Sequence, residues 1–343
     1  MAYLFGRPYT RSQLLSYVGE FSQIAGTTVG ELGDGNERGV RFIEMRSGSG
    51  LRCTILPDRG LDISAAEFRG IPLAWISPVG FGGRAYFEPQ GLGWLYGFGG
   101  GLMTGCGLTH AGAPDVDNGE ELGLHGRLSF LPARKVNRGE TWRGDECTIW
   151  VEGEIRQARV HGENLSLQRR ISTELGRSII RYDDVVENLS SYPSPLMMLY
   201  HINIGFPMLN ENCYLSAVDH KVSCRDAEAE KGIEHWSHFQ TPTPQFKEQV
   251  FYHDLPSDSD GYAQITLVNP ILKLKLTVRY LKASLFNLVQ WKMMGQSQYV
   301  LGLEPANCFV EGRSKDRARG VLKELKPGEK ETFAVEIIIE EEK

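Results

Sequence analysis

The feature that most constrains the fold is an alternation of apolar and polar residues that runs from about Val40 to the C-terminus. Successive side chains of a β-strand point to opposite faces, so this period of two marks strands with one buried face. Turn-forming clusters separate the runs, namely SGSG at 47–50, LPDRG at 56–60 and Pro327-Gly328. The runs include Leu51, Cys53 and Ile55; Leu165 and Leu167; 147–151; 179–186; 271–280; and Phe333, Val335, Ile337 and Ile339.

Helical patterns are scarce in this chain. Thr10 and Gln13 form the signature of a capping box, and Leu14, Leu15, Val18 and Phe21 follow at helical spacing. No long helical patterns lie between the strands, which argues against a doubly wound parallel sheet or a TIM barrel. We expect an all-β fold, a large antiparallel β-sandwich with a short N-terminal helix. We expect a single domain over residues 1–343, with 1–39 as the helix and its lead-in.

Charge and cysteine usage narrow the range of functions. The formal net charge of −6 opposes binding to nucleic acid, because such binding relies on a surplus of Lys and Arg. The N-terminus lacks the basic and apolar regions of a signal peptide, and no segment approaches about 18 uninterrupted apolar residues. The six cysteines include no CxxC pair, which is typical of reduced, buried thiols. We therefore expect a cytoplasmic protein with no membrane partner.

Three short strings carry the candidate chemistry: LHGRL at His125, LYHINIGFP at His201 and LGLEP at Glu304. Each places a titratable side chain beside apolar, Gly or Pro neighbours, where partial desolvation moves pKa values toward neutrality. Glu304 ends an apolar strand before Pro305, and a buried Glu is rarely tolerated unless it is paired or functional. A core histidine bonded to a carbonyl is the alternative for His201, and an ordinary surface loop is the alternative for His125. We predict that the three residues meet in one cleft.

The segment Gly80–Gly107 is rich in glycine and aromatic residues. It lacks GK[ST] and a G-x-G-x-x-G that opens a helix, so it is not a phosphate-binding loop. Its aromatic rings are suited to stacking on the C–H face of a sugar, with Trp94 or Tyr96 as candidates. The alternative is a glycine-rich rim with ordinary packing. No carboxylate or Cys is placed near His235 and His238 as a metal site would need, so we predict no metal site.

In their order along the chain, the three strings resemble those of the galactose mutarotase (aldose 1-epimerase) superfamily, especially its bacterial epimerase-like branch. Val185–Pro207 resembles the family's N-x-S-x-x-P-x-P … H-x-x-F segment, and Leu288–Pro305 resembles its strand leading to Gly-x-Glu-Pro. LHGRL resembles the family's earlier His-Gly motif. The resemblance covers the chain from about Val40 onward and implies a large antiparallel β-sandwich.

The resemblance also implies an activity, the interconversion of sugar anomers by ring opening and closure, without cofactor or metal. Glu304 corresponds to the general base, His201 to the general acid and His125 to a histidine that binds the sugar. Arg127 after His-Gly and Ile202 after His201 depart from the family pattern, which predicts a pocket shaped for a different sugar. Lys292 or Arg127 in the pocket would favour an anionic sugar. The candidates for substrate contacts are His125, Arg127, Arg59, Arg84, Asp117, Glu120, Lys292 and Trp94.

Two other interpretations remain open at this point. One is a non-catalytic carbohydrate-binding module on the same fold, and the other is a related sugar isomerase or lyase that uses the same His and Glu. Glycoside hydrolysis is less expected, because it requires two carboxylates flanking the bond and Glu304 is the one carboxylate that the motifs single out. The partner we expect is a small-molecule sugar, and a homodimer is compatible with the sequence.

Overall fold

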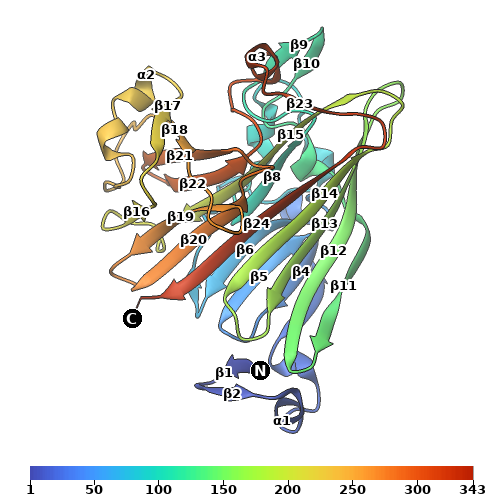
Figure 1. Cartoon of the computed structure of the whole chain (residues 1–343), viewed down its shortest axis with the longest axis vertical. Coiled ribbons are helices and arrows are strands. Elements are labelled where there is room, and N and C mark those ends of the chain that lie inside the picture. The colour runs from blue at the N-terminus through green and yellow to red at the C-terminus, as the bar shows by residue number, and fades with distance from the viewer. Residues whose placement is uncertain (343) are drawn as a thin grey trace.

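The computed structural model describes residues 1–342 and is built mainly from two large antiparallel sheets that pack against each other (Figure 1). Their facing sides share one large apolar core, to which strands of both sheets contribute. The predicted all-β sandwich is confirmed.

The eight-stranded sheet has the order β11 (Arg134–Arg143), β12 (Glu146–Ala158), β13 (Asn164–Glu174), β14 (Ile179–Asn188), β24 (Lys330–Glu341), β20 (Leu274–Leu281), β19 (Tyr262–Asn269) and β16 (Tyr214–Ser216). The twelve-stranded sheet has the order β17 (Lys221–Cys224), β18 (Gln249–Asp254), β21 (Asn287–Gly295), β22 (Gln298–Ala306), β15 (Ser194–Gly205), β8 (Met103–Leu108), β6 (Asp62–Phe68), β5 (Leu51–Leu56), β4 (Arg41–Arg46) and β3 (Gly26–Glu31). Short strands β7 (Ile71–Pro72) and β23 (Lys323–Leu325) pair with β6 and β15.

Two small hairpins and a few short helices complete the described chain. The hairpins are β1 (Ala2–Leu4) with β2 (Arg7–Tyr9), and β9 (Asp115–Asp117) with β10 (Glu120–Leu122). The α-helices are α1 (Arg11–Leu15), α2 (Ala227–Glu230) and α3 (Arg313–Arg319). The 3₁₀ turns are η1 (Phe21–Gln23), η2 (Gly35–Glu37), η3 (Arg84–Tyr86), η4 (Gly93–Gly97), η5 (Leu128–Phe130) and η6 (Ile233–His235). None of the helices in residues 1–342 has the length and apolar character needed to cross a bilayer.

In the C-terminal strand β24, buried and more exposed residues alternate as the sequence predicts. Phe333, Val335, Ile337 and Ile339 are buried in the main core while the residues between them are more exposed. Burying each such side chain contributes about 1.5–3 kcal/mol. One predicted boundary shifts, because 271–273 form a turn and β20 begins at Leu274.

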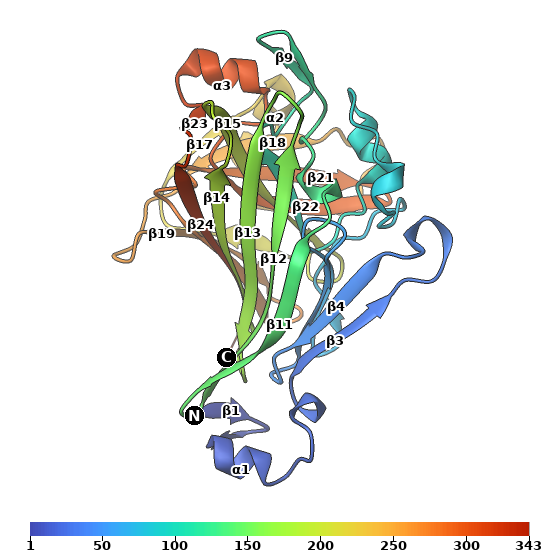
Figure 2. The same cartoon turned by 90° about the vertical axis from the view of Figure 1, so that its right-hand side faces the viewer.

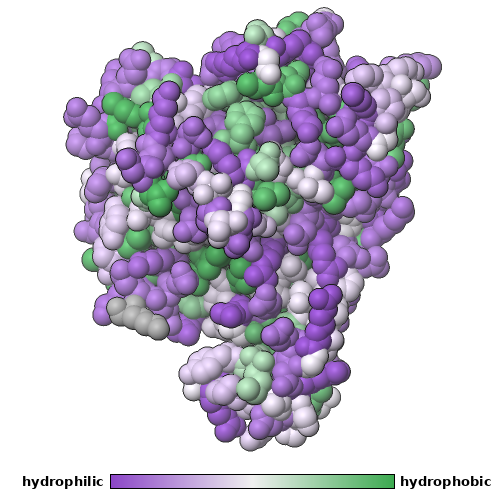
Figure 3. Space-filling view, viewed as in Figure 1, coloured by the Kyte–Doolittle hydropathy of each residue, from purple (hydrophilic) through white to green (hydrophobic). Residues whose placement is uncertain are grey.

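The N-terminal segment matches the prediction only in part. Thr10 caps α1 and Gln13 completes the capping box, but the helix ends at Leu15, so Val18 and Phe21 lie outside it. Strand β3 pairs with β4 and therefore adds a strand before Val40. Its mostly exposed residues gave no alternation to detect. The β1–β2 hairpin and α1 project beyond the sandwich at its lower end, where Figure 3 shows a mixed polar and apolar surface.

The twelve-stranded sheet is covered on both faces at its centre. Along β15, Met198, Tyr200 and Ile202 face the main core, whereas Met197 and Leu199 join a second apolar cluster on the opposite face. That second cluster includes side chains from the loops around Trp94 and Phe130. A strand buried on both faces reads as a continuous apolar run, which explains LMMLY before His201. Figure 2 shows these loops beside β21 and β22.

Candidate active site

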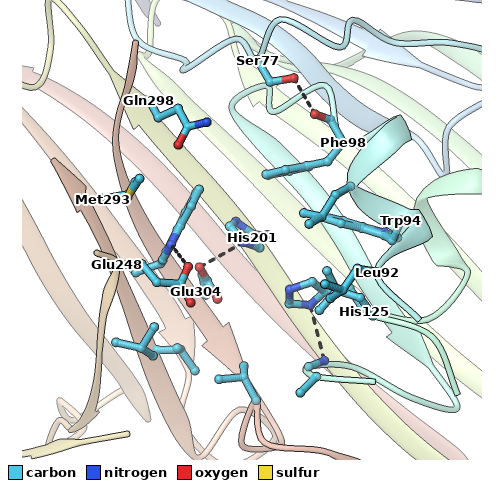
Figure 4. Close-up of a pocket in the computed structure, with 18 of the residues that line it drawn as sticks. Ser77, Leu92, Trp94, Phe98, His125, His201, Glu248, Met293, Gln298 and Glu304 are labelled. Atoms are coloured by element: carbon cyan, nitrogen blue, oxygen red, sulfur yellow. Dashed lines mark hydrogen bonds and ion pairs between the residues drawn. The ribbon is translucent and has the colours of Figure 1, made fainter. Parts of the chain in front are cut away.

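A cavity of about 580 Å³ opens between the twelve-stranded sheet and the loops that cover its outer face. This volume lies in the range of small-molecule binding sites. The structure brings His125, His201 and Glu304 together in its wall (Figure 4). The other lining residues are Trp75, Ser77, Pro78, Val79, Leu92, Trp94, Leu95, Phe98, Gly112, Ala113, Pro114, Leu124, Arg225, Glu248, Val250, Val289, Trp291, Met293, Gln298 and Val310.

His201 and Glu304 form the centre of the cavity wall. They come from the paired strands β15 and β22, and His201 Nε2 lies 3.2 Å from Glu304 Oε1. Both side chains are buried, yet within residues 1–342 His201 Nδ1 and Glu304 Oε1 have no well-aligned hydrogen bond. Buried polar atoms are normally satisfied, so unsatisfied ones in a cavity wall mark a place where a ligand can bind.

The Gly-x-Glu spacing has a steric reason. Gly302 and Glu304 point to the same face of β22, and the Glu304 carboxylate folds back over Gly302. A Cβ at position 302 would overlap Glu304 Oε1 and would lie 2.9 Å from Cβ of Trp291. The absence of a side chain at Gly302 therefore makes room for the carboxylate beside His201.

Burial dominates the protonation of this pair. It raises the pKa of Glu304 well above 4.5, and the negative charge of Glu248 adds to the rise while Arg225 opposes it. Burial also lowers the pKa of His201 to about 4. The cavity thus favours the uncharged forms, a protonated carboxyl beside a neutral imidazole.

His125 lies across the cavity from this pair. Its ring centroid is 5.5 Å from that of His201 and 4.8 Å from that of Trp94. Its backbone is left-handed, with φ of 54°, which is costly for a residue other than Gly and is typical of functional sites. Gly126 follows with φ of 71°, and a Cβ there would overlap the carbonyl oxygen of His110. The His-Gly motif is therefore a turn that aims the imidazole at the cavity.

Burial lowers the pKa of His125 well below 6.5, and His201 nearby adds to this effect. Its Nδ1 accepts a hydrogen bond from the backbone N–H of Gly112 at 3.4 Å. His125 is therefore a neutral group in the free protein, with Nε2 left to carry the proton. A neutral imidazole N–H can bind a sugar oxygen without bringing a charge into the cavity.

Aromatic rings form much of the remaining wall. Trp94 stacks on Phe98, with 4.4 Å between centroids, and Trp291 meets His201 edge-on at 5.4 Å. In Figure 4, Trp94, Phe98 and His125 lie on one side of His201, and Glu248, Met293 and Glu304 lie on the other. The structure places Trp94 in the cavity wall but leaves Tyr96 exposed and outside the lining.

The sequence matches the model of a family described as a domain of unknown function, DUF4432, over residues 37–339. The chain belongs to this family. No protein with a curated description matches the chain in sequence.

Solved structures place this DUF4432 chain in a wider fold group. A Klebsiella pneumoniae protein described provisionally as an aldose 1-epimerase superposes with a TM-score of 0.88 at 25% identity, covering 97% of this chain and 87% of that one. A galactose mutarotase-like protein from Clostridium acetobutylicum gives 0.65 at 15% identity, covering 93% and 99%. Galactose 1-epimerase from Lactobacillus acidophilus gives 0.58 at 14% identity, covering 93% and 100%. The resemblance to the galactose mutarotase-like superfamily is confirmed, and with it the fold.

Two of the charged residues predicted to contact substrate instead hold the scaffold of this DUF4432 chain. The Arg59 guanidinium is buried and donates to the carbonyl oxygens of Ser129, Gly82 and Gly97, so it ties down the loop that carries Trp94. Lys292 is buried as well, and its Nζ donates to the carbonyl oxygens of His235 and His238. Neither lines the cavity that contains His201.

The other predicted contacts also lie elsewhere. Arg84, Arg127 and Glu120 line a separate cavity of about 780 Å³. Asp117 accepts from Arg313 Nε at 2.7 Å and from Arg317 Nη2 at 2.8 Å, which fastens the β9–β10 hairpin to α3. Arg59, Arg84, Arg127, Asp117, Glu120 and Lys292 were expected in one cleft with the three titratable residues, and that placement is wrong: none of them lines the cavity that contains His201.

A chain of polar contacts in the cavity was missed by the sequence reasoning. Glu248 Oε2 accepts a hydrogen bond from Trp291 Nε1 at 2.8 Å, and its Oε1 accepts one from Arg225 Nη2 at 3.0 Å. Trp291 could have been found, since Val289, Trp291 and Met293 alternate on the face of β21 that adjoins Glu304. Glu248 and Arg225 lie in loop regions with no local pattern, and only the tertiary structure brings them to the cavity.

Proposed function

We propose that this protein interconverts the anomers of an aldose by acid–base catalysis, with Glu304 and His201 as the catalytic residues. The observation that carries the proposal is the buried His201–Glu304 pair, 3.2 Å apart, in the wall of a cavity of sugar-binding size. A carboxyl and an imidazole at this distance can share one proton, which supplies one acid and one base at the same time. Structural neighbours described as aldose 1-epimerases support a fold suited to sugar epimerisation.

The proposed reaction has two steps. The Glu304 carboxylate takes the proton of the anomeric O1–H while the His201 imidazolium gives its proton to the ring oxygen. The C1–O5 bond breaks, and C1–O1 becomes a carbonyl. Rotation about C1–C2 and the reverse proton transfers then close the ring from the other face. Burial favours the form with the proton on Glu304 and a neutral His201. From that form the reaction runs with the two roles exchanged: the Glu304 carboxyl gives its proton to the ring oxygen while His201 takes the proton of O1–H, as a reversible reaction requires.

The supporting residues follow from the cavity geometry. His125 is placed to bind a sugar oxygen through its neutral ring, and Trp94 and Trp291 offer aromatic surface to the C–H groups of the sugar. A positioned acid or base contributes about 10²- to 10⁴-fold each, which is sufficient for a reaction that already proceeds slowly in water.

Anomeric exchange measured by NMR saturation transfer tests the proposal. Wild-type protein should accelerate exchange of at least one aldose, and Glu304→Gln should lower that rate by about 10²- to 10⁴-fold while keeping sugar binding. Glu67→Gln is a matched control, because the Glu67 side chain on β6 is 43% exposed and lies outside the cavity. Binding without acceleration would indicate a carbohydrate-binding module. An unsaturated product with ultraviolet absorbance would indicate a lyase.

A further inference from the structure

The charges around the cavity favour an uncharged ligand. Among the described lining residues Arg225 is the one permanently cationic side chain, and it faces two acidic residues in the same lining, Glu248 and Glu304. Its Nε donates to Asp226 Oδ2 at 2.8 Å and its Nη2 to Glu248 Oε1 at 3.0 Å. The guanidinium carries one positive charge and contacts two carboxylates, those of Asp226 and Glu248. This group of three side chains therefore has an excess of one negative charge. A phosphate or carboxylate on the sugar would find repulsion and no unpaired cation.

The two cations expected from the sequence to attract an anionic sugar do not change this balance. Lys292 Nζ donates hydrogen bonds to two carbonyl oxygens, and burial lowers the pKa of Lys292 to about 8. Arg127 lines the separate cavity behind the His125 turn. The expectation of an anionic sugar therefore loses its basis.

Apolar side chains outnumber polar ones in the cavity lining. Apart from the catalytic pair and His125, the polar side chains among the described lining residues are Ser77, Arg225, Glu248 and Gln298, with the Trp indoles. The Ser77 hydroxyl already donates to the Phe98 carbonyl and accepts from the Val79 N–H. A sugar hydroxyl that faces the apolar part of the wall would have no partner there and would carry a desolvation cost.

The mouth of the cavity offers apolar contact instead. Val79, Leu92 and Leu95 line it and are 38%, 60% and 47% exposed. Leu92 and Leu95 flank Trp94 in sequence and come from the same loop, and Leu92 lies beside this wall in Figure 4. Large aliphatic side chains exposed together at a cavity mouth are typical of a surface that covers an apolar group of a ligand.

We infer that the substrate is an uncharged aldose in which a methyl group stands in place of the hydroxymethyl group, that is, a 6-deoxyhexose. This inference rests on the proposed function, since it names the substrate of the same site. The anomeric centre lies at His201 and Glu304, and the deoxy edge contacts Leu92 and its aliphatic neighbours. Discrimination comes from hydroxyl groups that the apolar wall leaves unsatisfied and from repulsion of anions by Glu248.

Matched sugar pairs test the inference by saturation transfer: D-fucose with D-galactose, L-rhamnose with L-mannose, and 6-deoxy-D-glucose with D-glucose. In at least one pair we expect the deoxy member to have a kcat/KM at least about 10-fold higher, because one methyl-for-hydroxymethyl change in an apolar site discriminates by about that much. Glucose 6-phosphate and glucuronate should fall at least about 10-fold below glucose in exchange or binding. Preference for the hydroxymethyl sugar in every pair, or for a charged sugar over glucose, would overturn the inference while leaving the proposed function intact.

Failure of the proposed function gives a different result. If no aldose exchanges faster with the protein, anomerase activity is refuted, and the same pairs compared by ligand-observed NMR binding decide the substrate class. Equal or weaker binding of the deoxy sugars would then reject the inference as well.

One substitution tests whether the apolar mouth of the cavity causes the preference for 6-deoxy sugars. Leu92→Asn should reduce the deoxy preference several-fold. Leu189→Asn changes a 39% exposed leucine outside the cavity and should leave the preference at the wild-type value. If Leu92→Asn kept the wild-type preference, the claim that the apolar mouth selects deoxy sugars would be wrong.

Discussion

Replacing Gly302 by alanine would place a methyl group where the Glu304 carboxylate now lies. Ordinary Cβ contacts begin near 3.4 Å, whereas this Cβ would overlap Glu304 Oε1 and approach Cβ of Trp291 to 2.9 Å. The carboxylate would have to move by about 1 Å, and a displacement of that size costs about 10²-fold in rate. That factor corresponds to about 2.7 kcal/mol of transition-state stabilisation. The added methyl would also cost about 1–3 kcal/mol of unfolding free energy through overpacking.

The assay is anomeric exchange on the best aldose, with chemical denaturation to show that the variant is folded under the assay conditions. Gly139→Ala is the matched control, because it makes the same change in strand β11 where the nearest atom, Trp150 Cζ2, lies at a tolerable 3.4 Å. We expect wild-type exchange in the control. A folded Gly302→Ala protein that exchanges anomers at the wild-type rate would refute the argument that Gly302 positions the carboxylate.

The remaining predictions concern pH and stability. Glu248→Gln removes a negative charge that raises the pKa of Glu304, so that pKa should fall and activity that needs the carboxylate should persist to lower pH; a pH–rate profile checks this, and an unchanged acid limb would contradict it. The amide oxygen of Gln can still accept from Trp291 Nε1, so kcat at the optimum should change little. Asp184→Ala leaves the buried Arg169 without the carboxylate that now lies 2.7 Å from its Nη2. The free energy of unfolding should fall by about 3–5 kcal/mol in urea titrations, and a loss below about 1 kcal/mol would count against a tightly coupled pair.

The strands and the three titratable positions could be predicted from the sequence because their signals are local. The alternation around Phe333 to Ile339 records one buried face, and the apolar surroundings of His201 and Glu304 record burial of groups that proteins rarely bury without a reason. The structure also explains why glycine stands beside two of these residues. Gly302 makes room for the Glu304 carboxylate, and Gly126 completes the turn at His125.

The charged substrate contacts could not be predicted in the same way. Arg59, Asp117 and Lys292 look equally available in the sequence, but the structure binds them to carbonyl oxygens or to guanidinium groups from distant segments. Conversely, Glu248 and Arg225 have no local pattern and enter the cavity only because the loop before β18 folds beside β21. The role of a charged side chain depends on the group that it contacts, and for these residues that group lies far away in the sequence.

The sequence alone therefore determined the class of fold and the residue types of the candidate acid–base pair, because period, turn chemistry and apolar context act over a few residues. Only the tertiary structure decided that the pair meets. The register of β15 against β22, which pairs Ile202 with Leu303, sets His201 next to Glu304. It also decided the electrostatics of the cavity, since burial and the placement of Glu248 depend on segments packed from across the chain. Strand register and burial are properties of the whole assembled sheet, and no short stretch of sequence contains them.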